Sequence, residues 1–211
     1  MPALLDNIDP TGLEEFSVVF TDRSLNHMSK EFQQVMCDLS SNLKEVYNSK
    51  AVVLVPGGGT FAMEAVARQF GIDADVLVIR NGWFSYRWSQ IFETSANART
   101  TTVVKARMIG NESVAPFRPA EVDDVVNKIK TDRPNIVFAP HVETSAGVIL
   151  PDEYIKKIST AAHEVGALMV LDCIASGCVW IDMEDCGVDV LISAPQKGWS
   201  ASPSAGLVML S

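Results

Sequence analysis

The chain has 211 residues, of which 47% are hydrophobic and 20% charged, and its formal net charge is −9. These values are typical of a globular protein with one domain, or one domain and an appendage, and the acidic balance argues against a nucleic acid or an anionic membrane as partner. No apolar stretch approaches the length of about 18 residues that a membrane span needs. Because the first residues lack a basic region and an apolar signal core, we expect a cytoplasmic protein.

The first 28 residues show no long periodic pattern, and we expect them to form an N-terminal arm over the surface or a partner. A helix is predicted over 29–48, because seven apolar residues follow helical spacing and would share one face. Apolar runs then alternate with helical patterns. The predicted strands are 51–55, 75–79, 101–105, 135–139, 167–171, 188–192 and 205–210. The predicted helices are 61–70, 84–95, 119–130 (with Pro119 in its first turn) and 152–165.

This alternation predicts an α/β domain over 29–211, with a mostly parallel seven-stranded sheet and helices on both faces. No helical pattern precedes the last strand, which is therefore the candidate for an antiparallel one. In open α/β sheets, ligands bind beyond the carboxyl ends of the strands. We therefore expect the loops after the strands at 51–55, 75–79, 135–139, 167–171 and 188–192 to lie together.

A lysine and an aspartate follow two of these strands. Asp172 ends the apolar run 167–171, and Lys197 follows the run 188–192. A carboxylate after five apolar residues needs a partner or water, and a protonated pyridine nitrogen is one such partner. The pair suits pyridoxal phosphate: Lys197 would hold the cofactor as an imine and act as general acid and base, while Asp172 would keep the ring nitrogen protonated. The alternatives are a solvated loop lysine and a turn aspartate.

A glycine-rich segment, Gly57-Gly-Gly-Thr60, lies between a predicted strand and a predicted helix. Glycines and a helix N-terminus suit a phosphate, although a simple turn is the alternative. The pattern Gly57-x-Gly59-x-x-Ala62 also fits a loose dinucleotide fingerprint. That fingerprint expects an acid at the end of the second strand, where this chain has Arg80. NAD is therefore disfavoured, and NADP stays open.

Other polar and aromatic residues follow the predicted strands. Trp83 and Phe84 could stack on a planar ring or pack the start of a helix. His141 and Glu143 could hydrogen-bond a cofactor or cap their loop. The four cysteines, at 37, 173, 178 and 186, include no second close pair and no nearby histidine, so no metal site is expected. We expect all four to act as small buried hydrophobic residues.

Five segments, in this order, resemble the class V pyridoxal-phosphate aminotransferases, nearest to the alanine–glyoxylate and serine–pyruvate branch. They are Gly57-Gly-Gly-Thr-Phe-Ala-Met-Glu-Ala65, Asn81-Gly-Trp-Phe-Ser-Tyr-Arg-Trp88, His141-Val-Glu-Thr-Ser-Ala-Gly147, Leu171-Asp-Cys-Ile-Ala-Ser176 and Ser193-Ala-Pro-Gln-Lys-Gly198. The resemblance covers about residues 20–211. It implies the large domain of fold type I, a homodimer at full length, and transamination between a small amino acid of alanine or serine type and a 2-oxo acid of glyoxylate or pyruvate type.

The resemblance also implies a role for each matching residue. Lys197 would be the Schiff-base lysine and Asp172 the partner of the pyridine nitrogen. The phosphate would be bound by Gly58, Gly59 and Thr60, with Gln196 nearby. The ring would be stacked on by Phe84, contacted near its hydroxyl by Thr144 and packed on its opposite face by Ile174. Trp83 is a second candidate for stacking, and Ser85 stands where many relatives have glycine.

The chain departs from this family in length. Family members continue beyond the lysine into a small C-terminal domain, which supplies the arginine for the substrate carboxylate and a loop that reaches the other subunit. We therefore expect an incomplete large domain that binds the cofactor weakly and turns over poorly. The alternatives are a cysteine desulfurase-like enzyme, in which histidine usually stands in place of Gln196, a non-catalytic remnant of the fold, and an NADP-binding protein.

Overall fold

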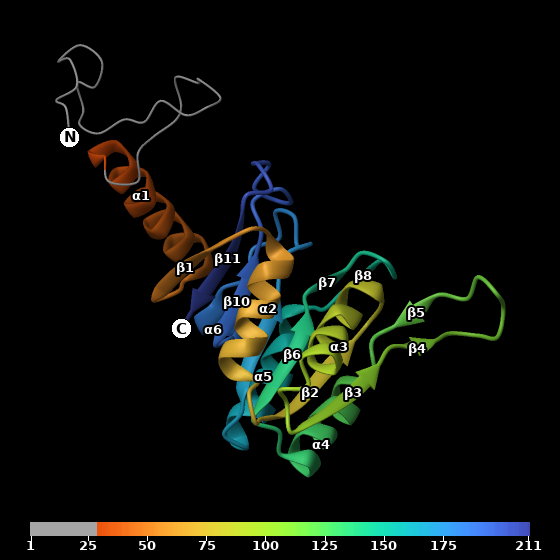
Figure 1. Cartoon of the computed structure of the whole chain (residues 1–211). Helices are drawn as coiled ribbons and strands as arrows, with labels where there is room; N and C mark the ends of the chain where they lie inside the picture. The colour runs from red at the N-terminus through yellow and green to blue at the C-terminus, as the bar shows by residue number, and fades with distance from the viewer. Residues whose placement is uncertain (1–28) are drawn as a thin grey trace, which may run out of the picture.

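A computed structural model describes residues 29–211 (Figure 1). Its centre is a seven-stranded sheet in the order β1-β11-β10-β9-β6-β2-β3. The strands are β1 (Ala51–Pro56), β2 (Asp75–Arg80), β3 (Thr100–Lys105), β6 (Ile136–Pro140), β9 (Leu168–Asp172), β10 (Val190–Ser193) and β11 (Ala205–Leu210). β11 pairs antiparallel with β1 and β10, and the remaining pairs are parallel. The predicted sheet and its antiparallel last strand are confirmed, while the predicted arm at 1–28 lies outside the described residues.

Helices cover both faces of this sheet. They are α1 (Lys30–Tyr47), α2 (Gly59–Phe70), α3 (Trp83–Ser95), α4 (Val122–Asp132), α5 (Asp152–Glu164) and α6 (Met183–Cys186). Side chains of α2 and α3 form one core with Val76 and Val78 of β2, and side chains of α1, α4, α5 and α6 form another with Leu77 and Ile79. The alternation along β2 follows from the two-residue period of a strand, which sends successive side chains to opposite faces.

The first half of α1 differs from its prediction. Ser29 caps the helix, since its Oγ accepts a hydrogen bond from the Phe32 N–H at 3.1 Å, but only Leu43 and Tyr47 of the helix are buried. Val35, Met36 and Leu39 are exposed, because only the end of the helix packs on the sheet while its beginning projects past the edge (Figure 1). The expected single buried face is therefore confined to the last turns of α1.

Three further predictions were incomplete or wrong. α4 begins at Val122 rather than at residue 119, so Pro119 lies before the helix. Cys173 and Cys186 are buried, but Cys37, on the projecting half of α1, and Cys178, in the loop after β9, are exposed.

The structure adds α6 and two hairpins that were not predicted. The hairpins are β4 (Arg107–Met108) with β5 (Phe117–Arg118) and β7 (Val142–Glu143) with β8 (Val148–Ile149), and their strands are too short to show a period. No helix in the described part of the chain is long and apolar enough to cross a membrane.

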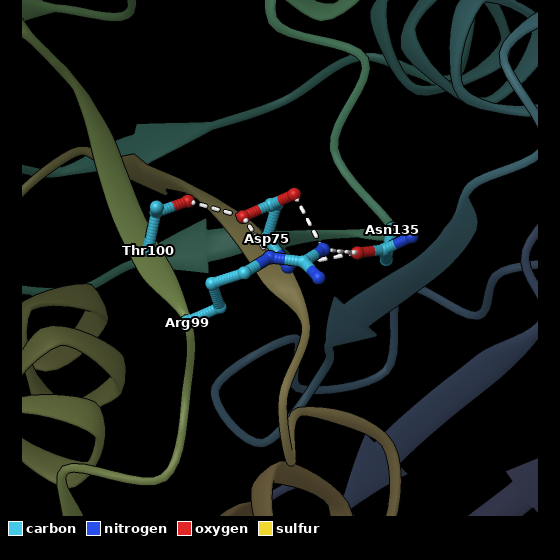
Figure 2. A network of polar contacts seen from close by, with 4 residues as sticks. All are labelled: Asp75, Arg99, Thr100 and Asn135. Atoms are coloured by element: carbon cyan, nitrogen blue, oxygen red, sulfur yellow. Dashed lines mark hydrogen bonds and ion pairs between the residues drawn. The ribbon is translucent and has the colours of Figure 1, made fainter.

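A polar network joins the beginnings of β2, β3 and β6 (Figure 2). The Asp75 carboxylate accepts hydrogen bonds from Arg99 Nε at 2.9 Å, Arg99 Nη2 at 2.6 Å and Thr100 Oγ1 at 2.8 Å. Asn135 Oδ1 accepts from the Asp75 N–H at 2.8 Å and from Arg99 at 3.1 Å. The hydrogen bonds from Arg99 and Thr100 hold the pKa of Asp75 below its usual value. The network fixes the amino ends of three strands whose carboxyl ends lie at the opposite edge of the sheet.

Candidate functional site

A cavity of about 480 Å³ opens at the carboxyl edge of the sheet, and segments from all five expected loops line it. The structure brings every predicted site residue to this cavity. They are Gly58, Gly59, Thr60, Phe84, Thr144, Asp172, Ile174, Gln196 and Lys197. The parallel strands explain the convergence, because each of them ends at the same edge. The described part of the chain holds no group of three or more His, Cys, Asp or Glu residues placed to bind a metal ion.

The glycine-rich loop leads directly into the N-terminus of α2. Gly58 is the N-cap of the helix, Gly59 is its first residue, and Thr60 follows in the first turn. A Cβ atom on Gly59 would lie 2.7 Å from Ile174 Cδ1, so any larger residue here would push the Ile174 side chain aside. Arg87 Nη1 donates a hydrogen bond to Thr60 Oγ1 at 3.1 Å. Free N–H groups, the helix dipole and a guanidinium therefore meet at one end of the cavity, an arrangement that suits a phosphate.

Asp172, the last residue of β9, is 7% exposed. Its Oδ1 accepts a hydrogen bond from the Ile174 N–H at 2.9 Å, and no cation pairs with it in the described part of the chain. Burial raises the pKa of Asp172 to about 6, against the lowering effect of the Ile174 hydrogen bond, and the charge of Glu143 raises it further. A buried carboxylate in this state favours a partner that brings an N–H donor or a positive charge.

Lys197 lies in the loop between β10 and β11 and is exposed toward the cavity that it lines. The next residue fixes this loop by close backbone packing, because a Cβ atom on Gly198 would lie 2.0 Å from the Gly177 carbonyl oxygen. Gln196 Oε1 is buried in the same cavity wall and has no hydrogen-bond partner in the described part of the chain. The lysine is thus held at the cavity next to an amide with an unused acceptor.

Glu143 fixes the start of α3 and with it Phe84. Its buried carboxylate accepts hydrogen bonds from the Phe84 N–H at 3.1 Å, the Ser85 N–H at 2.9 Å and the hydroxyls of Ser85 and Ser145, each at 2.6 Å. Burial alone would raise the pKa of Glu143, but these hydrogen bonds outweigh it and hold the pKa below its ordinary value. Phe84 lines the cavity, whereas Trp83, the second candidate for stacking, is 62% exposed and lines a different cavity. Of the two roles considered for Glu143, the structure shows the capping role.

Two polar residues complete the surroundings of the cavity. His141 is buried and is not among the residues that line the cavity; its Nδ1 lies 2.7 Å from Ser176 Oγ, and burial lowers the pKa of His141 below its ordinary value. Arg87, which lines the cavity, was not predicted from the sequence. The available signal was its position three residues after Phe84, because helical residues at this spacing share a face.

The family model described as aminotransferase class V matches residues 13–210. A soluble hydrogenase small subunit from Synechococcus sp. is 30% identical over 190 residues, which cover 89% of this chain and 47% of that protein. Alanine–glyoxylate aminotransferase from Rattus norvegicus is 28% identical and matches 88% of this chain and 43% of its own length. The solved structure of alanine–glyoxylate aminotransferase from Nostoc sp. superposes with a TM-score of 0.74 at 26% identity, over 89% of this chain and 47% of that one.

The fold is that of the pyridoxal-phosphate-dependent aminotransferases, as predicted. The chain belongs to the class V aminotransferase family. It spans about half the length of the curated relatives it matches. The dinucleotide alternative loses its support, because the glycine-rich loop follows β1 at the edge of the sheet, whereas the dinucleotide fold places this loop on a central strand.

Family membership confirms pyridoxal phosphate as the cofactor, and the cavity fits it on chemical grounds. The N-terminus of α2 with Arg87 suits the phosphate, and the buried Asp172 suits the ring nitrogen. Apolar side chains from Phe84 and Ile174 suit the two faces of a ring, and Lys197 supplies an amine. The role of each residue stays a prediction.

Proposed function

We propose that the protein transfers an amino group between a small amino acid and a 2-oxo acid with the help of pyridoxal phosphate. The observation that carries this proposal is the buried Asp172 carboxylate, which lacks a cationic partner in the described residues and shares a cavity with Lys197. When bound, the cofactor supplies an electron sink that stabilises negative charge on the α-carbon of the substrate. The alanine–glyoxylate relatives support an alanine-type donor and a glyoxylate- or pyruvate-type acceptor.

In this proposal, each residue of the cavity has a separate role. The Asp172 carboxylate holds a proton on the ring nitrogen by charge and hydrogen bonding. The N–H groups of Gly59 and Thr60, with Arg87, bind the phosphate and so fix the position of the ring. Lys197 Nζ would hold the cofactor, and as a free amine it would accept the proton that the substrate α-carbon loses and donate it again, acting as general base and then general acid. Phe84, which lines the cavity, would pack against the ring and limit the access of water to it.

A spectroscopic experiment tests this proposal. The purified protein is incubated with pyridoxal phosphate, reduced with borohydride and analysed by mass spectrometry and absorbance. We expect one cofactor attached to each chain, at Lys197, and no attachment in Lys197→Ala. The control is Lys157→Ala, which removes an exposed lysine on α5 and should change nothing.

Each rival gives its own outcome in this experiment. A folded wild-type chain without an adduct would contradict the proposal and support a non-catalytic remnant. Saturable NADPH binding that is indifferent to Lys197→Ala would support the dinucleotide alternative. Formation of alanine from cysteine by the loaded protein, with sulfide released in the presence of an added thiol reductant and no transfer of an amino group from alanine, would support the desulfurase alternative.

We also propose that the protein forms a homodimer and resides in the cytoplasm. The homodimer is supported by the exposed apolar side chains of Val35, Met36 and Leu39 on α1, since exposed apolar patches commonly mark protein interfaces. Light scattering of the wild type and of Val35→Ser/Leu39→Ser tests it. The dimer predicts a twofold mass that the double variant loses, whereas a wild-type monomer would contradict it.

A further inference from the structure

A second cavity, of about 620 Å³, lies beside the start of α3 and is separate from the cofactor cavity. The two cavities meet at the same two segments. Trp83 and Ser145 line the second cavity, while their chain neighbours Phe84 and Thr144 line the first. The volume lies within the range of about 300–1,000 Å³ that is usual for sites that bind small molecules. Nothing in the proposed transamination uses this second space.

Two cationic side chains lie side by side in this cavity. Arg80 and Lys105 are the last residues of β2 and β3 and are direct partners in the parallel register, so their side chains lie on the same face of the sheet. Neither forms an ion pair within residues 29–211. Arg80 Nη1 contacts Ser89 Oγ at 3.5 Å and its guanidinium lies 4.9 Å from the centre of the Tyr86 ring. Because like charges on paired positions of neighbouring strands repel, a bound anion would stabilise the pair.

The rest of the lining limits the kind of anion. Glu93 brings one carboxylate, so the cavity has a net positive charge in a chain whose net charge is −9. Trp83, Tyr86 and Phe117 form aromatic walls, and Trp83 and Phe117 are 62% and 47% exposed. Asn81 also lines the cavity, and its buried side-chain amide has no hydrogen-bond partner in the described residues. Aromatic walls around a cationic end suit a molecule with a flat apolar body and one negative group.

We propose that this second cavity is a binding site for a small aromatic anion. Its carboxylate or phosphate group binds between Arg80 and Lys105, and its ring packs against Tyr86, Trp83 and Phe117. A bidentate contact from Arg80 favours a planar or tetrahedral oxyanion, and Lys105 adds a point charge. The site does not depend on the proposed transamination, because none of these five residues lines the cofactor cavity.

Isothermal titration calorimetry on the purified protein tests the site with three probes, phenyl phosphate, benzoate and inorganic phosphate. To fill the cofactor cavity first, the protein is loaded with pyridoxal phosphate, reduced with borohydride and freed of unbound cofactor, because free pyridoxal phosphate is itself an aromatic anion that would compete for the second site. We expect one saturable site for phenyl phosphate or benzoate, and whichever binds more tightly identifies the negative group. Inorganic phosphate should bind more weakly because it lacks the ring. Equal affinity for inorganic phosphate and phenyl phosphate, or no saturable binding of any probe, would overturn the proposal.

Charge variants locate the binding. Lys105→Gln and Arg80→Gln should each weaken binding of the aromatic anion about tenfold or more, whereas Arg80→Lys, which keeps the charge but loses the bidentate geometry, should weaken it less than Arg80→Gln does. The control is Lys157→Gln, which removes an exposed cation on α5 that lines neither cavity and should leave the affinity unchanged. Loss of binding in Arg87→Gln, which removes a cation from the cofactor cavity, but not in Lys105→Gln would place the anion in the cofactor cavity and overturn the proposal. Should Arg80→Gln fail to fold, the exposed Lys105 decides the question alone.

Discussion

Replacing Asp172 by asparagine is expected to stabilise the cofactor-free protein while weakening its hold on the cofactor. An asparagine Oδ1 can still accept the hydrogen bond that the Ile174 N–H donates at 2.9 Å. Burial raises the pKa of Asp172 from 3.8 to about 6. This shift corresponds to about 3 kcal/mol against the folded state at neutral pH, which the neutral amide avoids. Since about 1 kcal/mol shifts the melting temperature of a domain of this size by about 2–4 °C, the variant should melt about 6–12 °C higher.

The pH dependence of this gain has a definite sign. Because the folded state keeps the proton on Asp172 to a higher pH than the unfolded chain does, the wild type loses stability as the pH rises from about 4 to about 6. Circular dichroism melts of both proteins without cofactor are recorded from about pH 4 to about pH 8. The difference in melting temperature between Asp172→Asn and the wild type should increase as the pH rises through this window. Glu112→Gln, which neutralises an exposed carboxylate, is the control and should leave the melting temperature unchanged.

Two results would refute the burial argument for Asp172. One is a variant that melts at or below the wild-type temperature at neutral pH. The other is a difference in melting temperature that stays constant with pH. Addition of pyridoxal phosphate should reverse the order, because a ligand stabilises the folded state in proportion to its affinity, and the carboxylate binds a protonated ring nitrogen better than an amide does.

Three further predictions concern the frame around the site. Glu143→Gln should lower the free energy of unfolding, measured by chemical denaturation, by about 2–4 kcal/mol, because the start of α3 loses charge-assisted hydrogen bonds. A decrease below about 0.5 kcal/mol would contradict the capping role. Gly198→Ala should lower the melting temperature and the yield of cofactor adduct, since its Cβ would meet the Gly177 carbonyl, whereas Gly58→Ala, whose Cβ meets nothing within 4 Å, should leave the melting temperature nearly unchanged. Asp75→Asn should be less stable than the wild type at neutral pH and equal to it in acid, because the lowered pKa of Asp75 contributes stability that is lost as the pH falls below about 4; a difference that persists in acid would contradict this.

Much of the fold followed from local patterns. The seven strands begin and end within two residues of their predicted bounds, because each is a compact apolar run between turn residues. The convergence of Thr60, Asp172 and Lys197 on one cavity also followed from the sequence, since parallel strands deliver their loops to one edge of the sheet. What made these features predictable is that they depend on chain order and on the period of the side chains.

Features that depend on long-range contacts could not be predicted in this way. The burial of α1 depends on how far the helix extends past the sheet, which its apolar spacing does not encode, so Val35 and Leu39 were wrongly expected to be buried. The role of Glu143 depends on a contact with residues that lie 58 or 59 positions earlier in the chain. The second cavity needs the register that pairs Arg80 with Lys105, and a single sequence does not contain this register.

The antiparallel direction of β11 has a consequence for the lysine. β10 and β11 are hydrogen-bonded neighbours, so the segment 194–204 that carries Lys197 leaves and re-enters the sheet through adjacent strands, about 4.8 Å apart. A crossover to a parallel strand would have had to return to the opposite edge of the sheet, so its ends would lie about a strand length apart. With both ends anchored so close together, the segment has little freedom to carry its amine away. We therefore expect that inserting a residue into it displaces the Lys197 amine without unfolding the sheet, because lengthening a closed loop costs little free energy.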